Sequence, residues 1–319
     1  MPGVKRSNLL LLALTIIAAY AYLTYAALHP SLPSLKNPLV FYSNQHRQDF
    51  RLTLLRAIET ARTSIHIAIY SITDLKIIEK LHQKALQGIS VTVLIDPKAG
   101  SLPLPAPIQC RAEKGRGLMH RKIVVIDSSL VFLGSANLTP SSLLFHDNLS
   151  LGFYNPPLAH FLTHETTGTF TSPPFELFLL PHPGALPKLL QQLNSAEHSI
   201  TCAMFTLTHP ELTQALIAAH LRGVRVQVFL DYYAARGAGK KAALALQSSG
   251  IPVKLSQGMQ LMHHKWALID NKTLILGSTN WTKAAFTKNR DSLLFLENLS
   301  SQDKNYIQSL EHILQLEGR

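Results

Sequence analysis

The chain contains the same structural unit twice. Residues 64–96, SIHIAIYSITDLKIIEKLHQKALQGISVTVLID, align without a gap with residues 199–231, SITCAMFTLTHPELTQALIAAHLRGVRVQVFLD. In both copies apolar residues first alternate with the period of a strand, then follow helical spacing, and then alternate again. Gly88 and Gly223 lie where each helix should end. This duplicated β-α-β unit predicts an α/β fold of two repeated lobes, each a mixed β-sheet flanked by helices.

The two copies divide the rest of the chain. We expect the first lobe over residues 38–155 and the second over residues 175–319. A stretch rich in Pro, Thr, Gly and Ser between them, residues 156–174, is predicted to be the inter-lobe linker. The full chain of 319 residues is long enough for two core-forming units.

The N-terminus predicts a membrane anchor. A basic end over residues 1–8 precedes residues 9–27, an uncharged apolar run long enough to cross a bilayer. Residues 28–37 are predicted to be a short linker. The positive-inside rule places Lys5 and Arg6 in the cytoplasm and both lobes on the non-cytoplasmic side. A cleaved signal peptide is the alternative, and it would give a secreted protein.

Net charge and cysteine content limit the kinds of partner and cofactor that the sequence predicts. The formal net charge of +11 favours anionic partners, which are phospholipid headgroups at a membrane, nucleic acid or phosphorylated small molecules. The sequence has two cysteines, and it contains neither a cysteine cluster nor an HExxH pattern. We therefore expect no metal site and no cofactor.

A polar motif follows each β-α-β unit. Residues 119–139 read MHRKIVVIDSSLVFLGSANLT, and residues 262–282 read MHHKWALIDNKTLILGSTNWT. Each shared residue of the first motif recurs 143 positions later. The recurring pairs are His120/His263, Lys122/Lys265, Asp127/Asp270, Gly134/Gly277, Ser135/Ser278 and Asn137/Asn280. An acid lies downstream of each motif, Asp147 in the first copy and Asp291 in the second.

The first motif predicts a β-hairpin, and the second predicts the same one. A turn between residues 128 and 129 would place Asn137 opposite His120 and Ser135 opposite Lys122. The histidine and lysine, two residues apart, would share one face of the strand. Each lobe would then gather an imidazole, an ammonium, an amide and a hydroxyl around an anionic group such as phosphate.

The motif aspartates are expected to be structural. Asp127 and Asp270 lie five residues past the lysines, a distance of about 16 Å along an extended strand. We therefore predict that they hold a turn or pair with a basic group and do not contact the substrate.

Two such motifs suit phosphodiester hydrolysis without a metal. One histidine can attack phosphorus to form a phospho-histidine, while the other protonates the leaving oxygen. Two lysines and two asparagines can hold the non-bridging oxygens. A carboxylate can orient the nucleophilic histidine, and Asp147 and Asp291 are the candidates.

The pattern HxKxxxxD followed by GSxN resembles the phospholipase D superfamily across both lobes. The second copy, through NWTKAAFTKNRD, is especially similar to the small bacterial endonucleases and mitochondrial cardiolipin hydrolases of that superfamily. The resemblance implies a single active site at the lobe interface of one chain, so a monomer suffices. In the family the downstream acid often stands in an N-x-E pattern. Asn289–Arg290–Asp291 fits this better than Asp147, which is expected, with Ser135 and Ser278, to support the phosphate.

The identity of the nucleophile stays open at this point. Asp291 lies in the same lobe as His263, and if it orients that residue either histidine could attack. In family members with two motifs the N-terminal histidine usually attacks, which implies His120.

The expected function is hydrolysis of phospholipid phosphodiester bonds beside a membrane. A single-strand endonuclease is the first alternative. Phosphatidyl transfer is the second, although that branch of the superfamily usually carries two N-terminal spans. A non-catalytic phosphate-binding scaffold is the third.

Overall fold

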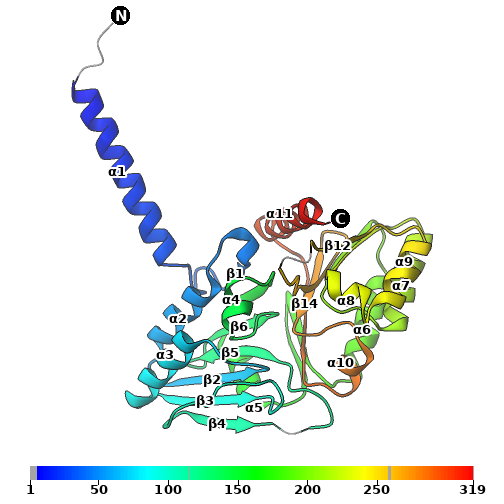
Figure 1. Ribbon diagram of the computed structural model, residues 1–319, viewed down its shortest axis with the longest axis horizontal. Helices are drawn as coiled ribbons and strands as arrows, with labels where there is room; N and C mark the ends of the chain where they lie inside the picture. Colours follow the sequence, from blue (N-terminus) through cyan, green and yellow to red (C-terminus); the bar gives the residue numbers. More distant parts are fainter. Residues whose placement is uncertain (1–5, 114, 258–259, 319) are drawn as a thin grey trace, which may run out of the picture.

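The computed structural model describes residues 6–113, 115–257 and 260–318, and its described part forms two sheets (Figure 1). The first has the order β1-β7-β6-β5-β2-β3-β4, with strands β1 (Leu39–Tyr42), β2 (Ser64–Ile69), β3 (Ser90–Ile95), β4 (Gln109–Ala112), β5 (Lys122–Ile126), β6 (Leu130–Gly134) and β7 (Ser150–Tyr154). The second has the order β12-β11-β10-β13-β14-β15-β9-β8, with strands β8 (Gly168–Ser172), β9 (Phe175–Leu179), β10 (Ser199–Met204), β11 (Arg225–Leu230), β12 (Val253–Leu255), β13 (Lys265–Ile269), β14 (Thr273–Gly277) and β15 (Ser292–Leu296).

The duplicated unit has the predicted topology in both lobes. Strand β2 pairs in parallel with β3 across helix α3 (Leu75–Leu86), and β10 pairs in parallel with β11 across α7 (Pro210–Leu221). Each first strand then pairs antiparallel with the motif strand, β5 or β13. Both sheets are therefore mixed, and the predicted α/β fold of two repeated lobes is confirmed.

The two sheets pack face to face over a shared core. Along β5, Ile123 and Val125 join a hydrophobic cluster that also holds Leu268 and Leu276 of the second sheet. Val124, on the opposite face of β5, belongs to a separate cluster under the first-lobe helices. The strands are thus buried on both sides, which explains their almost continuous apolar sequence.

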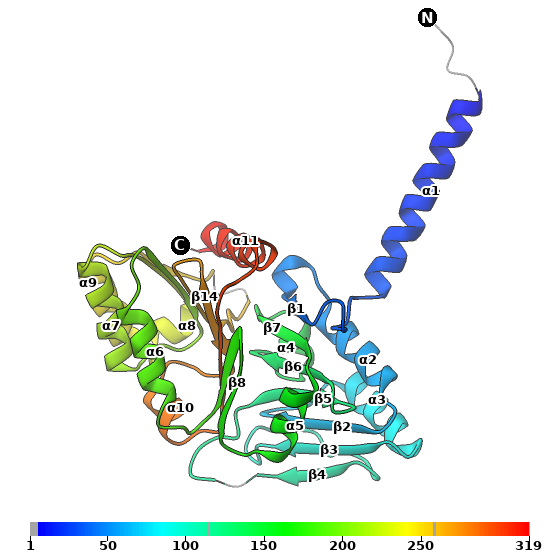
Figure 2. The same ribbon diagram turned by 180° about the vertical axis from the view of Figure 1, so that it is seen from behind.

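Helices cover the outer face of each sheet. In the first lobe these are α2 (Phe50–Thr60), α3 and α4 (Pro140–Leu144); the short 3-10 helix η1 (Asn44–His46) precedes α2. In the second lobe they are α6 (Ala185–Asn194), α7, α8 (Tyr232–Arg236), α9 (Lys240–Ser248) and α10 (Lys283–Thr287). Helix α11 (Ser301–Glu317) packs on the shared core and lies at the junction of the lobes in both views (Figures 1 and 2).

The stretch predicted to be a linker is folded, so that prediction is wrong. Residues 156–174 contain helix α5 (Pro156–His164) and strand β8, which pairs with β9 at the edge of the second sheet. Asn155 caps α5 by accepting a hydrogen bond from Leu158 N at 2.8 Å, and the following prolines occupy the first turn, where no backbone donor is needed. The prolines therefore begin a helix, and the side chain of Leu158 is fully buried in the shared core.

The predicted hairpin register is wrong by one residue. Ile126 pairs with Leu130, which leaves a three-residue loop whose first two residues, Asp127 and Ser128, have φ angles of 49° and 50°. The second hairpin has the same loop, with φ angles of 50° and 51° at Asp270 and Asn271. A loop of this length moves each cross-strand partner by one position relative to the predicted tighter turn.

Helix α1 (Arg6–Leu28) projects away from both lobes (Figure 1). It covers the predicted anchor, and its large apolar residues are exposed, with Leu10 at 65% and Tyr20 at 74%. Among the residues that the structure describes, no helix has the combined length and apolarity needed to cross a membrane. The anchor predicted over residues 9–27 is therefore not confirmed.

Candidate active site

The two motif histidines lie in the junction between the lobes, and each bonds to a residue of the opposite lobe. His120 Nδ1 is 2.8 Å from Asp291 Oδ1, and His263 Nδ1 is 3.0 Å from Asn148 Oδ1. Both histidines are buried, with residue exposures of 8% and 6%. The structure thus pairs Asp291 with the histidine of the other lobe and not with His263.

Short backbone bridges hold the two halves together. His120 N donates to Arg290 O at 2.8 Å, and His263 N donates to Asp147 O at 2.9 Å. Met119 and Met262 form the matching isolated bridges with Arg290 and Asp147. Each histidine therefore takes part in a cross-lobe backbone contact itself, and the two arrangements are related by an approximate twofold relation.

The twofold relation shows that Asn148 corresponds to Asp291. Ser278 Oγ donates to Asp291 Oδ1 at 2.7 Å, and Ser135 Oγ donates to Asn148 Oδ1 at 2.8 Å. Asn148 is not among the residues predicted from the sequence, which instead give Asp147 as the counterpart of Asp291. The signal was available, because Asn148 precedes Asp291 by the same 143 residues that separate the motifs.

The hydrogen bonds of Asn148 fix the tautomer of His263. Asn148 Nδ2 donates to Ser142 O at 2.8 Å and to His146 O at 3.2 Å, so its carbonyl oxygen faces the imidazole. His263 must then carry a proton on Nδ1, which leaves Nε2 for chemistry.

The carboxylate of Asp291 imposes the same tautomer on His120. Burial raises the pKa of Asp291, but the nearby His120, Lys122 and Ser278 outweigh burial and hold the pKa below its ordinary value. The ionised Asp291 accepts a hydrogen bond from His120 Nδ1–H, and His120 Nε2 is left unprotonated for attack. Burial lowers the pKa of both histidines.

The two motif lysines lie at the same site and are 3% exposed. Lys122 Nζ donates to His120 O at 2.8 Å, and Lys265 Nζ donates to His263 O at 2.9 Å. Burial lowers the pKa of Lys122 to about 7 and that of Lys265 well below its ordinary value. An anion between the two ammonium groups would offset this desolvation and favour their charged forms.

An aromatic ring packs beside each histidine and lysine. The Tyr70 ring is 5.2 Å from the His120 ring and 5.3 Å from Lys122 Nζ. The Phe205 ring is 5.0 Å from the His263 ring and 4.9 Å from Lys265 Nζ. These two aromatics were missed in the sequence, although they occupy equivalent positions in the duplicated unit.

The serines and the asparagines predicted to contact the phosphate have different hydrogen-bonding environments. Ser135 and Ser278 join the hydrogen-bond network of the site. The side-chain oxygens of Asn137 and Asn280 are buried and have no hydrogen-bond partner among the described residues. The one-residue register shift means that neither asparagine lies directly across the hairpin from its histidine.

The two motif aspartates hold the hairpin loops to neighbouring strands. Asp127 accepts from Arg62 N, Thr63 N and Ser64 N at 2.8 to 3.0 Å. Asp270 accepts from three successive backbone groups, Glu197 N, His198 N and Ser199 N. Both aspartates lie at the far end of the motif strands from the histidines.

Replacing Asp127 tests this structural contact. Asp127→Ala leaves three backbone donors without their acceptor, so we expect the free energy of unfolding to fall by about 1–3 kcal/mol. Asp127→Asn retains one carbonyl acceptor and should cost less. Urea denaturation measures both. Loss of catalytic rate in a variant of undiminished stability would contradict the structural role.

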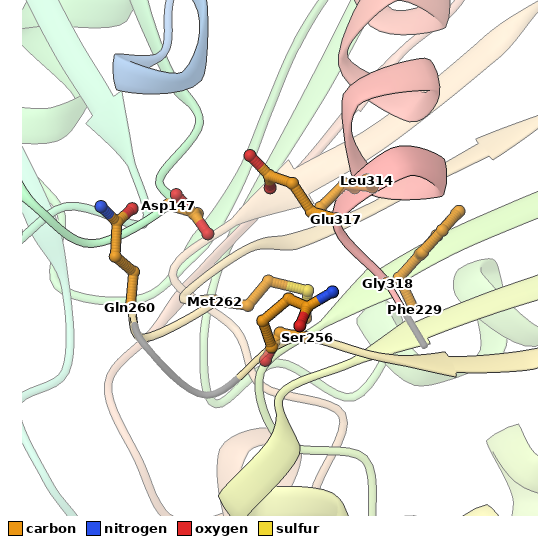
Figure 3. Close-up of a pocket in the computed structure, with 9 residues that line it drawn as sticks. Asp147, Phe229, Ser256, Gln260, Met262, Leu314, Glu317 and Gly318 are labelled. Atoms are coloured by element: carbon orange, nitrogen blue, oxygen red, sulfur yellow. The ribbon is translucent and has the colours of Figure 1, made fainter.

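Asp147 faces away from the histidines. Side chains alternate along the bridged segments, so Asn148 and His263 share one face while Asp147 and Met262 share the other. Asp147 instead lines a separate pocket with Met262 and Glu317 (Figure 3). The prediction that Asp147 supports the substrate phosphate is therefore wrong.

Asp147→Asn should change how stability depends on pH. Burial, with Glu317 and Asp231 nearby, raises the pKa of Asp147 to about 7. The folded state thus holds this proton more tightly than the unfolded chain, and stability falls as pH rises from about 4 to about 7. Asn carries no such penalty, so the variant should be more stable than the parent by up to about 4 kcal/mol above pH 7 and similar to it at low pH.

Urea denaturation of the two proteins at about pH 5 and about pH 8 checks this expectation. Glu211→Gln removes an exposed acid elsewhere and serves as the control. An identical pH dependence in the Asp147→Asn variant and its parent would contradict it.

No group of three or more side chains suited to hold a metal ion occurs in the described residue ranges. The chemistry available from the residues present is that of two imidazoles, two ammonium groups and one carboxylate.

Comparison with known proteins identifies relatives of both lobes. The family model described as "Cardiolipin synthase, PLD-like domain" matches residues 54–167 and 189–314. The mitochondrial cardiolipin hydrolase of Mus musculus is 39% identical over 120 residues, which are 37% of this chain and 54% of that protein. The phospholipase D of Rickettsia typhi is 33% identical over 118 residues, 37% of this chain and 57% of that protein. The chain thus spans about half the length of these relatives.

Solved structures also match almost the whole chain. The phosphatidylserine synthase of Haemophilus influenzae superposes with a TM-score of 0.71, covering 90% of this chain and 88% of that one. The sequence identity is 14%, so this likeness concerns the fold.

Proposed function

The chain belongs to the phospholipase D-like domain family, as its paired motifs predict, and we propose that it hydrolyses phospholipid phosphodiester bonds through a phospho-histidine intermediate. One observation carries the proposal: the two histidines share a buried site but have chemically different partners. A carboxylate contacts His120, whereas a neutral amide contacts His263.

In this mechanism His120 is the nucleophile. Asp291 accepts a hydrogen bond from His120 Nδ1–H and stabilises the positive charge that the imidazole gains when Nε2 bonds to phosphorus. His263 enters this step as the imidazolium, a form that the bound phosphodiester anion favours although burial lowers the pKa of His263. As the bond from phosphorus to the headgroup oxygen breaks, His263 Nε2 donates a proton to that oxygen. Asn148 orients His263 without a compensating negative charge, so the imidazolium gives up its proton readily.

The second half of the reaction reverses these roles. His263, now neutral, takes a proton from water, and the resulting hydroxide attacks phosphorus as the bond to His120 breaks. Lys122 and Lys265 bind the non-bridging oxygens in both steps and offset the charge that develops on them. The products are a phosphatidate and the free headgroup alcohol.

Phospholipid is the proposed substrate class, and a membrane surface is the proposed partner. Relatives covering part of the chain are named cardiolipin hydrolase and phospholipase D. Helix α1, which projects away from the catalytic body, also has exposed large apolar side chains such as Leu10 and Tyr20.

Transfer of the phosphatidyl group to an alcohol is the second candidate. The matching family model is described as a cardiolipin synthase, and an alcohol can replace water as the acceptor from a phospho-histidine. The two reactions differ only in which nucleophile enters after the first step.

The test is a side-by-side assay of the full chain. Vesicles of phosphatidylcholine or cardiolipin and a single-stranded oligonucleotide are supplied, each with and without added glycerol. Release of phosphatidate supports hydrolysis, and phosphatidylglycerol formed from added glycerol supports transfer. Cleavage of the oligonucleotide alone would overturn the phospholipid assignment in favour of a nuclease.

A further inference from the structure

A pocket separate from the active site lies on the other side of the backbone segments that carry Asn148 and His263. It has a volume of about 240 Å³, and the cross-lobe bridge between Asp147 and Met262 forms one of its walls. The same bridge presents Asn148 and His263 to the catalytic side. The bridge therefore separates this pocket from the catalytic groups, and a ligand could occupy it without contacting them.

The lining combines acids with apolar surfaces. Asp147 and Glu317 come from opposite sides of the pocket, and their carboxylates extend toward the same space (Figure 3). Phe229, Met262 and Leu314 supply the apolar part of the lining, and they are buried in the shared core. Such a pocket fits a ligand that is apolar on one side and positively charged on the other.

Asp147 lacks the partner that a buried carboxylate normally requires. The residue is 6% exposed, and among the described residues neither of its carboxylate oxygens has a hydrogen bond or an ion pair. Glu317, by contrast, accepts a hydrogen bond from Gln45 Nε2 at 2.8 Å. Buried charges are ordinarily paired, so the environment of Asp147 is incomplete without a positive group.

The twofold-related position carries a charge that the protein itself compensates. Arg290 of the second lobe corresponds to Asp147 of the first, 143 residues earlier, and it lines a matching pocket together with Met119. There Arg290 forms an ion pair with Glu113. The protein thus compensates the charge of Arg290, whose side chain is 30% exposed, and leaves the more deeply buried Asp147 without a counter-charge among the described residues.

We propose that the pocket lined by Asp147, Phe229, Met262, Leu314 and Glu317 binds a small organic ammonium ion, whose charge lies between the two carboxylates and whose apolar substituents pack on Phe229 and Met262. An aromatic ring beside an ammonium group adds cation–π attraction to the ion pairing. A free inorganic cation would leave the apolar wall unused.

The pocket and the phosphodiesterase centre carry charges of opposite sign. Two buried lysines line the catalytic side, so an ammonium ligand is repelled there and attracted here. This inference does not depend on the proposed function, since no catalytic residue contributes to the pocket. It does connect the pocket to that function, because Asp147 O accepts the hydrogen bond of His263 N.

Choline and its uncharged isostere 3,3-dimethylbutan-1-ol are the probes for this site. Each is titrated with the full chain at about pH 8, where Asp147 is ionised, and binding is followed by broadening of the methyl NMR signal. We expect choline to bind and the isostere to bind at least about tenfold more weakly, because only choline replaces the missing counter-charge. Equal binding of the two would overturn the proposal.

Variants locate the binding. Asp147→Asn should weaken choline binding about tenfold to hundredfold, while Glu211→Gln, with the same loss of charge at an exposed position, should leave it unchanged. Because Asp147→Asn is expected to stabilise the fold, its loss of binding cannot be assigned to unfolding. Undiminished binding in this variant, or no binding of choline to the parent, would refute the site.

A competition separates this result from the proposed function. Inorganic phosphate, which fits between the catalytic lysines, should not displace choline. Displacement by phosphate would place choline in the catalytic centre and overturn the separate site. Hydrolytic activity is not measured in any of these titrations, so failure here leaves the proposed function standing, and failure of the assay leaves this site standing.

Discussion

His263→Ala should accumulate a covalent phospho-enzyme that His120→Ala never forms. With a natural phospholipid both variants should lose about three or more orders of magnitude in rate, because each lacks a group that acts in both steps. With an activated ester whose leaving group needs no proton, such as a nitrophenyl phosphodiester, the first step no longer requires His263. His120 can then attack, and hydrolysis of the intermediate stalls because no base activates water.

Intact-protein mass spectrometry at neutral pH checks this expectation. The adduct mass should appear in His263→Ala after mixing with the activated ester, and peptide mapping should place it on His120. The double variant is the control for non-specific labelling. An adduct that forms on His263 in the His120→Ala protein would reverse the assigned roles.

The second large effect concerns the partner of each histidine. Asp291→Asn removes the carboxylate that stabilises the imidazolium of His120, and we expect the rate to fall by about two to four orders of magnitude. Asn148→Asp places a carboxylate beside His263 and should hold its proton more tightly. We therefore expect this variant to slow the first step less than Asp291→Asn does, and we expect its pH–rate profile to shift to higher pH.

The exchange variant Asp291→Asn with Asn148→Asp provides the matched control, because it preserves the total charge of the site. If the carboxylate selects the nucleophile, this double variant should recover part of the activity with the covalent adduct now on His263. A rate for Asp291→Asn close to that of the parent would contradict the role assigned to Asp291. Thermal unfolding of all three variants separates these effects from a loss of folded protein.

Much of the fold could be read from the sequence because it was encoded twice. Strand and helix periods in the duplicated unit are local signals, and their recurrence at a fixed spacing identifies two lobes of one topology. The stretch over residues 156–174 was misjudged because prolines mark both loops and helix starts. Only the packing of Leu158 into the shared core decides between these meanings.

The predictions of the hairpin register and of the downstream acid were wrong for the same reason, because each was displaced by one residue. Side chains alternate across a strand, so one position decides whether a residue faces the site or the opposite pocket. Asp147 and Asn148 are neighbours in sequence, yet Asn148 contacts His263 while Asp147 lines the pocket behind it. Chemical type favoured Asp147, and the backbone geometry selects Asn148.

The sequence by itself determined which groups are available: two His-x-Lys motifs, each at the start of a strand in a repeated lobe. Only the tertiary structure decided which residue each of these groups contacts. Asp291 follows His263 in the chain but contacts His120, because the lobes pack sheet against sheet and bring the start of β15 against the start of β5. The separation of Asp291 and His120 along the chain does not reveal this contact between the lobes. The contact gives the two histidines different partners.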